Sequence, residues 1–254
     1  MPLFETYLII LPLIFLAGLI DSIAGGGGLI SLPAYLVAGL PPHNALANNK
    51  MSSCFGTLLS TIRYFKHGMI DVKIAVTSAL FALIGSFFGT RLVLVMDANF
   101  LRYLLILLLP VIVIFTILKK NIGQNNNSFS IGTLRKVFLA ILVGLIIGTY
   151  DGFFGPGAGS FMILSFTLLL KYDFIMANGN TKVVNFASNI ASLIAFVISG
   201  KVLFYIGIPA AVVGVLGNHV GSRLVVKNGN KIIKPIFLCV FVMLFGKIVW
   251  DLIN

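Results

Sequence analysis

The stretch that decides the fold is Asp21-Ser22-Ile23-Ala24-Gly25-Gly26-Gly27-Gly28, where an aspartate and four glycines interrupt a long apolar run. A similar stretch, YDGFFGPGAGSF (residues 150–161), follows about half a chain later. In hydrocarbon every backbone N–H and C=O must be paired inside the protein, so glycine runs at membrane depth occur only where they are buried in protein or line a water-filled cavity. Broken helices at matching places in two halves indicate a transport site.

Composition supports a membrane protein. The 254-residue chain is 59% hydrophobic and 10% charged, with a mean hydropathy of +1.07, whereas soluble domains carry about 25% charged residues. Residues 72–95 and 100–118 match the ~20 apolar residues that cross a bilayer. No Lys or Arg precedes Lys50, so the first segment lacks the basic region of a cleaved signal peptide. The sequence therefore predicts an all-α polytopic membrane protein.

The net charge of +11, from 18 basic and 7 acidic residues, would suggest nucleic acid as a partner of a soluble chain. Here most basic residues lie in loops between predicted spans, where they contact lipid headgroups and orient the chain. We therefore expect the lipid bilayer, and no nucleic acid, as a partner. The basic residues divide almost equally between the two sides, so either side could face the cytoplasm. The scattered cysteines and histidines predict neither a metal site nor a cofactor.

The chain also contains an internal repeat. An offset of 132 residues superposes Lys50 on Lys182, and an offset of 130 superposes Asp21 on Asp151. We interpret residues 1–120 and 134–254 as two copies of one transmembrane unit. Residues 121–133 belong to a polar, Asn-rich stretch that predicts a flexible surface linker.

Each unit is predicted to contain a helix that ends at the glycines, a short apolar piece and three full spans. The expected elements are 7–24, 29–40, 44–65, 72–95 and 99–118, and then 134–154, 159–170, 176–199, 202–226 and 232–253. The short piece, about 18 Å long as a helix, is expected to be a half-helix or a re-entrant segment. That gives four crossings per unit, and an even number makes the units parallel copies. We therefore favour parallel over inverted repeats.

The glycine breaks either form an anion site, which we favour, or only allow close helix packing. The backbone N–H groups that begin each half-helix lack intrahelical partners, and the helix dipole adds partial positive charge there. Elsewhere, Gly85 and Gly89, like Gly217 and Gly221, have the spacing of four that is typical of close helix packing. No strand precedes either glycine cluster and no Gly-Lys-Ser/Thr is present, which disfavours a nucleotide loop.

Charged and amide side chains flank both breaks. The economical pairing joins Asp21 to Lys50 and Asp151 to Lys182, because unpaired ions inside a membrane are costly. These pairs either fix the broken helices or serve transport, with the lysines binding an anion and an aspartate accepting a proton. The candidate substrate-binding residues are Gly25, Gly26, Gly27, Gly28, Asn48, Asn49, Lys50, Gly155, Gly157, Gly159, Asn180, Thr181, Lys182, Asn185 and Asn189. Asp21 and Asp151 are the candidates for proton coupling or ion pairing.

DSIAGGGGLISLPA (21–34), GLPPHNALANNK (39–50), YDGFFGPGAGSF (150–161) and TKVVNFASN (181–189) resemble the sulfite exporter TauE/SafE family, and the similarity extends over essentially the whole chain. The resemblance implies a multi-pass protein of the bacterial inner membrane that transports small anions, often sulfite or organosulfonates. It also implies that the break glycines, Asn49, Lys50, Thr181, Lys182 and Asn185 form the core of the site. Three positions depart from the expected pattern: Asn48 replaces Thr, Ser52 replaces Gln and Ala158 replaces a hydroxyl residue.

Three functions remain open from the sequence. The first is a secondary transporter for a small anion, proton-coupled through Asp21 or Asp151, with alternating access around the breaks. The second is a passive anion channel built from the same helix ends. The third is a membrane scaffold held together by its ion pairs. No catalytic triad or poised carboxylate pair is present, so we do not expect an enzyme.

Overall fold

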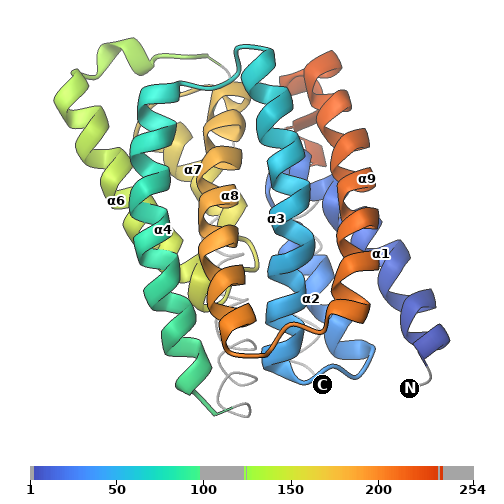
Figure 1. The fold of residues 1–254 in the computed structure, drawn as a ribbon. Coiled ribbons are helices and arrows are strands. Elements are labelled where there is room, and N and C mark those ends of the chain that lie inside the picture. The colour runs from blue at the N-terminus through green and yellow to red at the C-terminus, as the bar shows by residue number, and fades with distance from the viewer. Residues whose placement is uncertain (1–2, 98–122, 124, 234, 237–254) are drawn as a thin grey trace, which may run out of the picture.

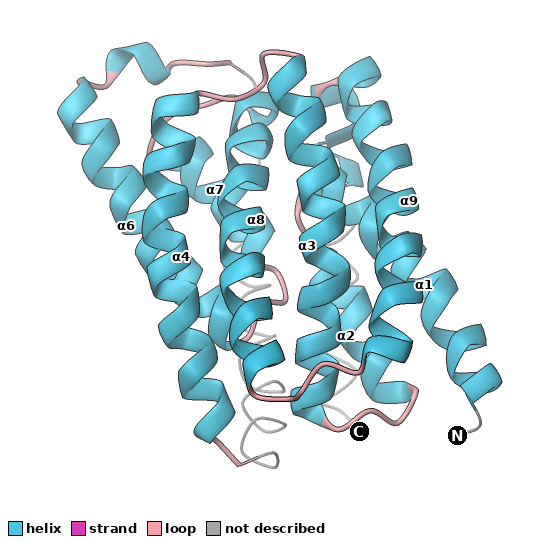
Figure 2. Ribbon diagram, viewed as in Figure 1, coloured by secondary structure: helices cyan, strands magenta, loops and turns pink. Residues whose placement is uncertain are grey.

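The computed structural model describes residues 3–97, 123, 125–233 and 235–236, and this part of the chain is helical without strands. The first half contains α1 (Leu3–Ala24), α2 (Gly28–Val37), α3 (Pro42–Lys66) and α4 (Val72–Val95). The second half contains the 3-10 turn η1 (Ser128–Ser130), α6 (Thr133–Phe153), α7 (Ala158–Leu168), α8 (Phe174–Ile198) and α9 (Phe204–Asn228). The all-α prediction is confirmed (Figure 2). The predicted span 99–118 and most of 232–253 lie outside the described residues.

Long helices form the body of the protein. Figure 1 shows α6, α4, α8, α3, α9 and α1 side by side, with α2 and α7 beside the breaks. Five of these helices, α1, α4, α6, α8 and α9, are long and apolar enough to cross a membrane. Their outward residues form apolar stripes with a spacing of four, such as Ile208, Val212, Leu216 and Val220 on α9. Such stripes are typical of lipid-facing helix surfaces, because hydrocarbon replaces water as the solvent there.

Helix α3 is the least apolar of the long helices because its inner face carries amides and a lysine. Asn48, Asn49 and Lys50 are all buried, on a helix that packs against both α8 and α9. On either side, α9 packs on α1 and α3, while α4 packs on α6 and α8. Among the helices that the structure describes, most packing is thus between the two halves rather than within one.

Glycines line the two outer seams, where they allow backbones to touch. A Cβ atom added to Gly148 of α6 would lie 2.6 Å from the Cα atom of Ala82 on α4. On the other side of the protein, a Cβ atom at Gly217 or Gly221 would collide with the backbone of α1. The packing role predicted for Gly217 and Gly221, and likewise for Gly85 and Gly89 against α6, is confirmed.

Corresponding helices of the two halves run in opposite directions. The start of α8 lies beside the end of α3, where the N–H of Asp71 donates to Oδ1 of Asn180 at 2.8 Å. The opposite ends meet where Nδ2 of Asn44 donates to the carbonyl of Lys201 at 2.8 Å. α3 and α8 are therefore antiparallel, and the expectation of parallel repeats is wrong: the two halves are inverted.

The path of α1 and α2 explains this correction. Thr6, near the start of α1, and Gly39 and Leu40, just after α2, line the same pocket. α1 and α2 thus enter and leave on one side and add no net crossing. The expectation of parallel repeats counted this pair as one crossing, so it placed the second half in the wrong direction.

The end of the predicted linker packs onto the protein instead of standing free. The N–H of Asn127 donates to the carbonyl of Lys171 at 2.9 Å, and the N–H of Phe174 donates to the carbonyl of Gly123 at 3.0 Å. These bonds hold the chain before α6 against the loop between α7 and α8. The repeat boundaries themselves stay a prediction.

Candidate functional site

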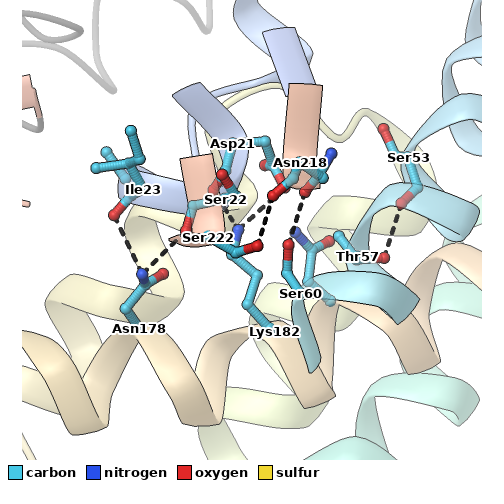
Figure 3. A network of polar contacts seen from close by, with 12 residues as sticks. Asp21, Ser22, Ile23, Ser53, Thr57, Ser60, Asn178, Lys182, Asn218 and Ser222 are labelled. Atoms are coloured by element: carbon cyan, nitrogen blue, oxygen red, sulfur yellow. Dashed lines mark hydrogen bonds and ion pairs between the residues drawn. The ribbon is translucent and has the colours of Figure 1, made fainter. Parts of the chain in front are cut away.

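At the first break, between α1 and α2, side chains from other helices donate hydrogen bonds to the last carbonyl groups of α1. Helix ends leave four carbonyl groups without intrahelical partners, and burying them unpaired is unfavourable. Nδ2 of Asn178 donates to the carbonyls of Ser22 and Ile23 at 3.0 and 3.1 Å. The hydroxyl of Tyr64 also donates to Ser22, at 2.7 Å. Figure 3 shows Asn178 reaching up to this helix end from α8.

The two breaks touch each other at the centre of the protein. Ser160, in the first turn of α7, donates its hydroxyl to the carbonyl of Ala24 at 2.8 Å and its N–H to the carbonyl of Gly25 at 3.1 Å. A Cβ atom at Gly25 would lie 2.5 Å from the carbonyl carbon of Gly159. Gly25 also has a φ of +74°, a backbone conformation that glycine adopts without penalty. Glycine is thus required at Gly25 both for backbone conformation and for contact.

Free backbone donors gather at this junction. Among the described residues, no acceptor pairs with the N–H groups of Gly26, Gly27, Gly28, Gly157 or Gly159. α2 and α7 begin here, so the positive ends of both helix dipoles add to these donors. The junction therefore gathers unpaired N–H groups and partial positive charge in one place, and anion binding there stays a prediction.

Two buried ion pairs cross between the halves. Nζ of Lys50 lies 2.7 Å from Oδ1 of Asp151, and Nζ of Lys182 lies 3.0 Å from Oδ2 of Asp21. The expected pairs, Asp21 with Lys50 and Asp151 with Lys182, are therefore wrong. Each lysine reaches the aspartate of the other half because the inverted halves face one another across α3 and α8.

The ion pairs are almost completely shielded from solvent, with Lys50 1% and Lys182 0% exposed. Removing one partner of such a pair lowers the free energy of unfolding by about 3–5 kcal/mol, because the other charge is left buried without a partner. Both pairs also contact the breaks: a Cβ atom at Gly155 would lie 3.3 Å from Nζ of Lys50, and one at Gly27 would lie 2.6 Å from Cβ of Asp21. Charges and free backbone donors thus share one buried region.

Some of the predicted amides join this region. Oδ1 of Asn189 accepts from Nζ of Lys50 at 3.2 Å, and Nδ2 of Asn189 donates to Asn185 at 3.1 Å. Oδ1 of Asn49 accepts from the hydroxyl of Ser31, in the first turn of α2, at 2.5 Å. The buried hydroxyl of Thr181 has no partner among the described residues.

Asn48 and Asn180 do not join the breaks. Nδ2 of Asn48 donates to the carbonyl of Asn44 at 2.8 Å, and its oxygen lies near Gly207 of α9. Asn180 instead binds the N–H of Asp71 in the loop after α3. Both amides lie on helix faces that point towards loops or neighbouring helices.

Sequence reasoning missed several partners of the site. Ser188 donates to Oδ2 of Asp151 at 2.5 Å, and Ser31, Ser160, Asn178 and Tyr64 hold the breaks as described above. Ser188 follows Asn185 by three residues, which places it on the helix face that the sequence had already marked. Nothing in the sequence indicates Asn178 or Tyr64.

The similarity to known proteins extends over nearly the whole chain. The family model described as "Sulfite exporter TauE/SafE" matches residues 10–248. The chain belongs to the TauE/SafE family. It is 36% identical over 239 residues to "Probable membrane transporter protein YfcA" of Escherichia coli K12, covering 93% of this chain and 87% of that protein.

Two further members of the TauE/SafE family show the same extent of similarity. "Probable membrane transporter protein ORF9" of a Sinorhizobium species is 38% identical and covers 93% of this chain and 90% of its own. A "Probable membrane transporter protein" of Haemophilus influenzae is 32% identical, with 93% and 92% covered. No solved structure gives a significant match. The protein is thus a multi-pass bacterial membrane protein of a transporter family, as the sequence predicts.

Proposed function

We propose that this protein is a secondary transporter that carries a small anion together with a proton, with sulfite and organosulfonates as the first cargo to test. The observation that carries the proposal is the pair of buried Lys–Asp bridges lying against the free N–H groups of two helix breaks. A scaffold needs paired charges, but it has no need for unpaired donors beside them.

Charge balance links the anion to the proton. Each lysine is neutralised by an aspartate, so an anion that enters must compete with a buried carboxylate. A proton on that carboxylate removes the competitor and leaves the lysine and the helix ends free for the anion. One proton and one monovalent anion then enter together, and the net charge of the site does not change.

The inverted halves supply a route for alternating access. Transporters with inverted repeats expose a central site to each side in turn by moving one repeat against the other. Here the two ion pairs and the contact between Gly25 and Gly159 all join one half to the other. Movement between the halves would therefore make or break the contacts that hold the anion.

The test is sulfite and organosulfonate flux into proteoliposomes under an imposed pH gradient. Wild type is compared with Lys50→Met and Lys182→Met, and Lys73→Met serves as a control because Lys73 is exposed in the first turn of α4. We expect saturable, gradient-driven flux that both site variants abolish and the control retains. Flux that neither saturates nor responds to the gradient would indicate a passive channel, and equal flux in all four proteins would refute the site.

A further inference from the structure

The two buried aspartates are not equivalent. Asp151 has both carboxylate oxygens occupied: Oδ1 accepts from Lys50 at 2.7 Å and Oδ2 from Ser188 at 2.5 Å. Oδ2 of Asp21 accepts from Nζ of Lys182 at 3.0 Å, and among the described residues its Oδ1 has no hydrogen-bond partner. The side chain of Asp21 is 12% exposed, compared with 4% for Asp151. One carboxylate is therefore fixed on both oxygens and the other on only one.

A small cavity lies beside Asp21. Its other lining residues come from α1, α2, α3 and α9 and include Gly27, Ser31, Ser52 and Asn218. The space open to the centre of a water molecule is about 10 Å³, which is roughly enough for one water. Asp151 is not among the residues that line it. The half-bound carboxylate therefore lies against a space that can hold about one water molecule.

The difference in hydrogen bonding between Asp21 and Asp151 comes from a few residues that differ between the repeats. The offset of 132 places Gly56 of α3 where α8 has Ser188, so the first half lacks the hydroxyl that occupies the second oxygen of Asp151. The same offset places Asn218 opposite Ser86. A Cβ atom at Gly56 would collide with the Asn218 amide, which fills the space that a serine would need.

Polar side chains continue from this cavity towards the end of α9. Ser60 donates to Oδ1 of Asn218 at 2.9 Å, and Ser222 donates to the carbonyl of Asn218 at 2.6 Å. Arg63 then donates to Ser222 at 2.7 Å. Figure 3 shows Ser60, Asn218 and Ser222 grouped beside Asp21 and Lys182. A line of hydroxyl, amide and guanidinium groups therefore joins the cavity to the surface between α3 and α9.

On the basis of the proposed function, we infer that Asp21 is the carboxylate that takes up the transported proton, through this cavity, while Asp151 stays fixed to Lys50. When Asp21 gains the proton, Lys182 loses its carboxylate partner but keeps its bond to the backbone carbonyl of Asp21. The freed ammonium group and the N–H groups of Gly26 to Gly28 then face the anion. When the anion leaves, Asp21 releases the proton and the ion pair re-forms.

Among the residues that the structure describes, few charged or titratable groups lie close to Asp21. The ionisable groups that face it are Lys182 from α8 and Tyr64 from α3, whose hydroxyl is engaged by the carbonyl of Ser22. α7 has no ionisable side chain, and the described part of α2 has only Tyr35, which binds Ser52. His219 of α9 binds Arg63 rather than Asp21. Protonation of Asp21 therefore acts on Lys182 above all.

The inference is tested by labelling with dicyclohexylcarbodiimide, which adds to protonated carboxyl groups in apolar surroundings. The purified full-length protein is treated at several pH values, and mass spectrometry measures the adduct on each aspartate. We expect several-fold more adduct on Asp21 than on Asp151, increasing as the pH falls. Equal labelling, preferential labelling of Asp151, or no adduct on either residue at any pH would overturn the inference.

Two variants test the role of the hydroxyl that is present at Ser188 and absent at Gly56. Ser188→Gly removes the hydroxyl from Asp151 and is expected to raise its labelling. Gly56→Ser supplies the missing hydroxyl and is expected to lower the labelling of Asp21; if that variant does not fold, Ser188→Gly alone decides. Unchanged labelling in Ser188→Gly refutes the structural explanation. Asp21 labelling in a protein that moves no anion would refute only the proposed transport, whereas anion flux without preferential labelling would refute only the role of Asp21.

Discussion

The crossed ion pairs predict a specific pattern of energetic coupling. Lys50→Met leaves the carboxylate of Asp151 buried and without its cation, at 4% side-chain exposure. The expected loss is about 3–5 kcal/mol of unfolding free energy. Asp151→Asn leaves Lys50 buried without a carboxylate and should cost about as much. The double variant removes both charges, so it should cost less than the sum by about 3 kcal/mol.

The control combines Lys50→Met with Asp21→Asn. Lys50 and Asp21 share no ion pair or hydrogen bond in the described structure, so their effects should add within about 0.5 kcal/mol. Sequence reasoning alone, which pairs Lys50 with Asp21, predicts the reverse pattern.

Thermal unfolding in detergent measures these effects, with a maleimide dye reporting the exposure of the buried thiol of Cys54. At about 2–4 °C per kcal/mol, each single variant should lower the melting temperature by on the order of 10 °C. Additive losses for Lys50 with Asp151, together with coupling between Lys50 and Asp21, would refute the crossed arrangement.

Three further predictions concern packing and loops. Gly25→Ala should lower the unfolding free energy by more than about 4 kcal/mol, since its Cβ would lie 2.5 Å from a backbone carbon. Gly39 is also at positive φ but faces open space, so Gly39→Ala should lower it by only about 1 kcal/mol. The yield of folded protein in membranes compares the two variants. Gly148→Leu should force α6 away from α4 and abolish the single symmetrical peak in size-exclusion chromatography, whereas an unchanged peak would contradict the seam. Tyr172→Phe removes the 2.6 Å hydrogen bond to Asp71 and should cost about 1–3 kcal/mol by melting temperature; burial and this bond raise the pKa of Tyr172, so its hydroxyl remains a donor at neutral pH.

Much of the helix layout could be predicted from the sequence, because lipid imposes strict lengths and strict backbone pairing. The span predicted at 72–95 coincides with α4, and the helix predicted at 134–154 matches α6 to within one residue at each end. Glycine clusters mark both breaks for the same reason, since no other residue allows such close contact there.

The direction of the second half could not be predicted in the same way. It depends on whether each short helix continues across the bilayer or turns back, and a short apolar segment is compatible with both. The partners of Lys50 and Lys182 depend in turn on that direction. An error in counting crossings thus becomes an error in the contacts of the site.

The unequal aspartates show a further limit. The change from Ser188 to Gly56 is visible once the repeats are superposed. Its effect on Asp21 nevertheless depends on Asn218, which comes from another helix and occupies the vacated space. Sequence comparison locates such a difference, but the packing around it determines what it does.

The crossed ion pairs also constrain how the chain is made. Lys50 is synthesised 101 residues before Asp151, and Asp21 precedes Lys182 by 161 residues. At synthesis rates of about 5–20 residues per second, each early charge waits on the order of ten seconds for its partner. During that interval each charge is unpaired, which is costly at membrane depth, so we expect the first half to stay beside the insertion machinery or in contact with water. Completion of the second half then lets both charges pair.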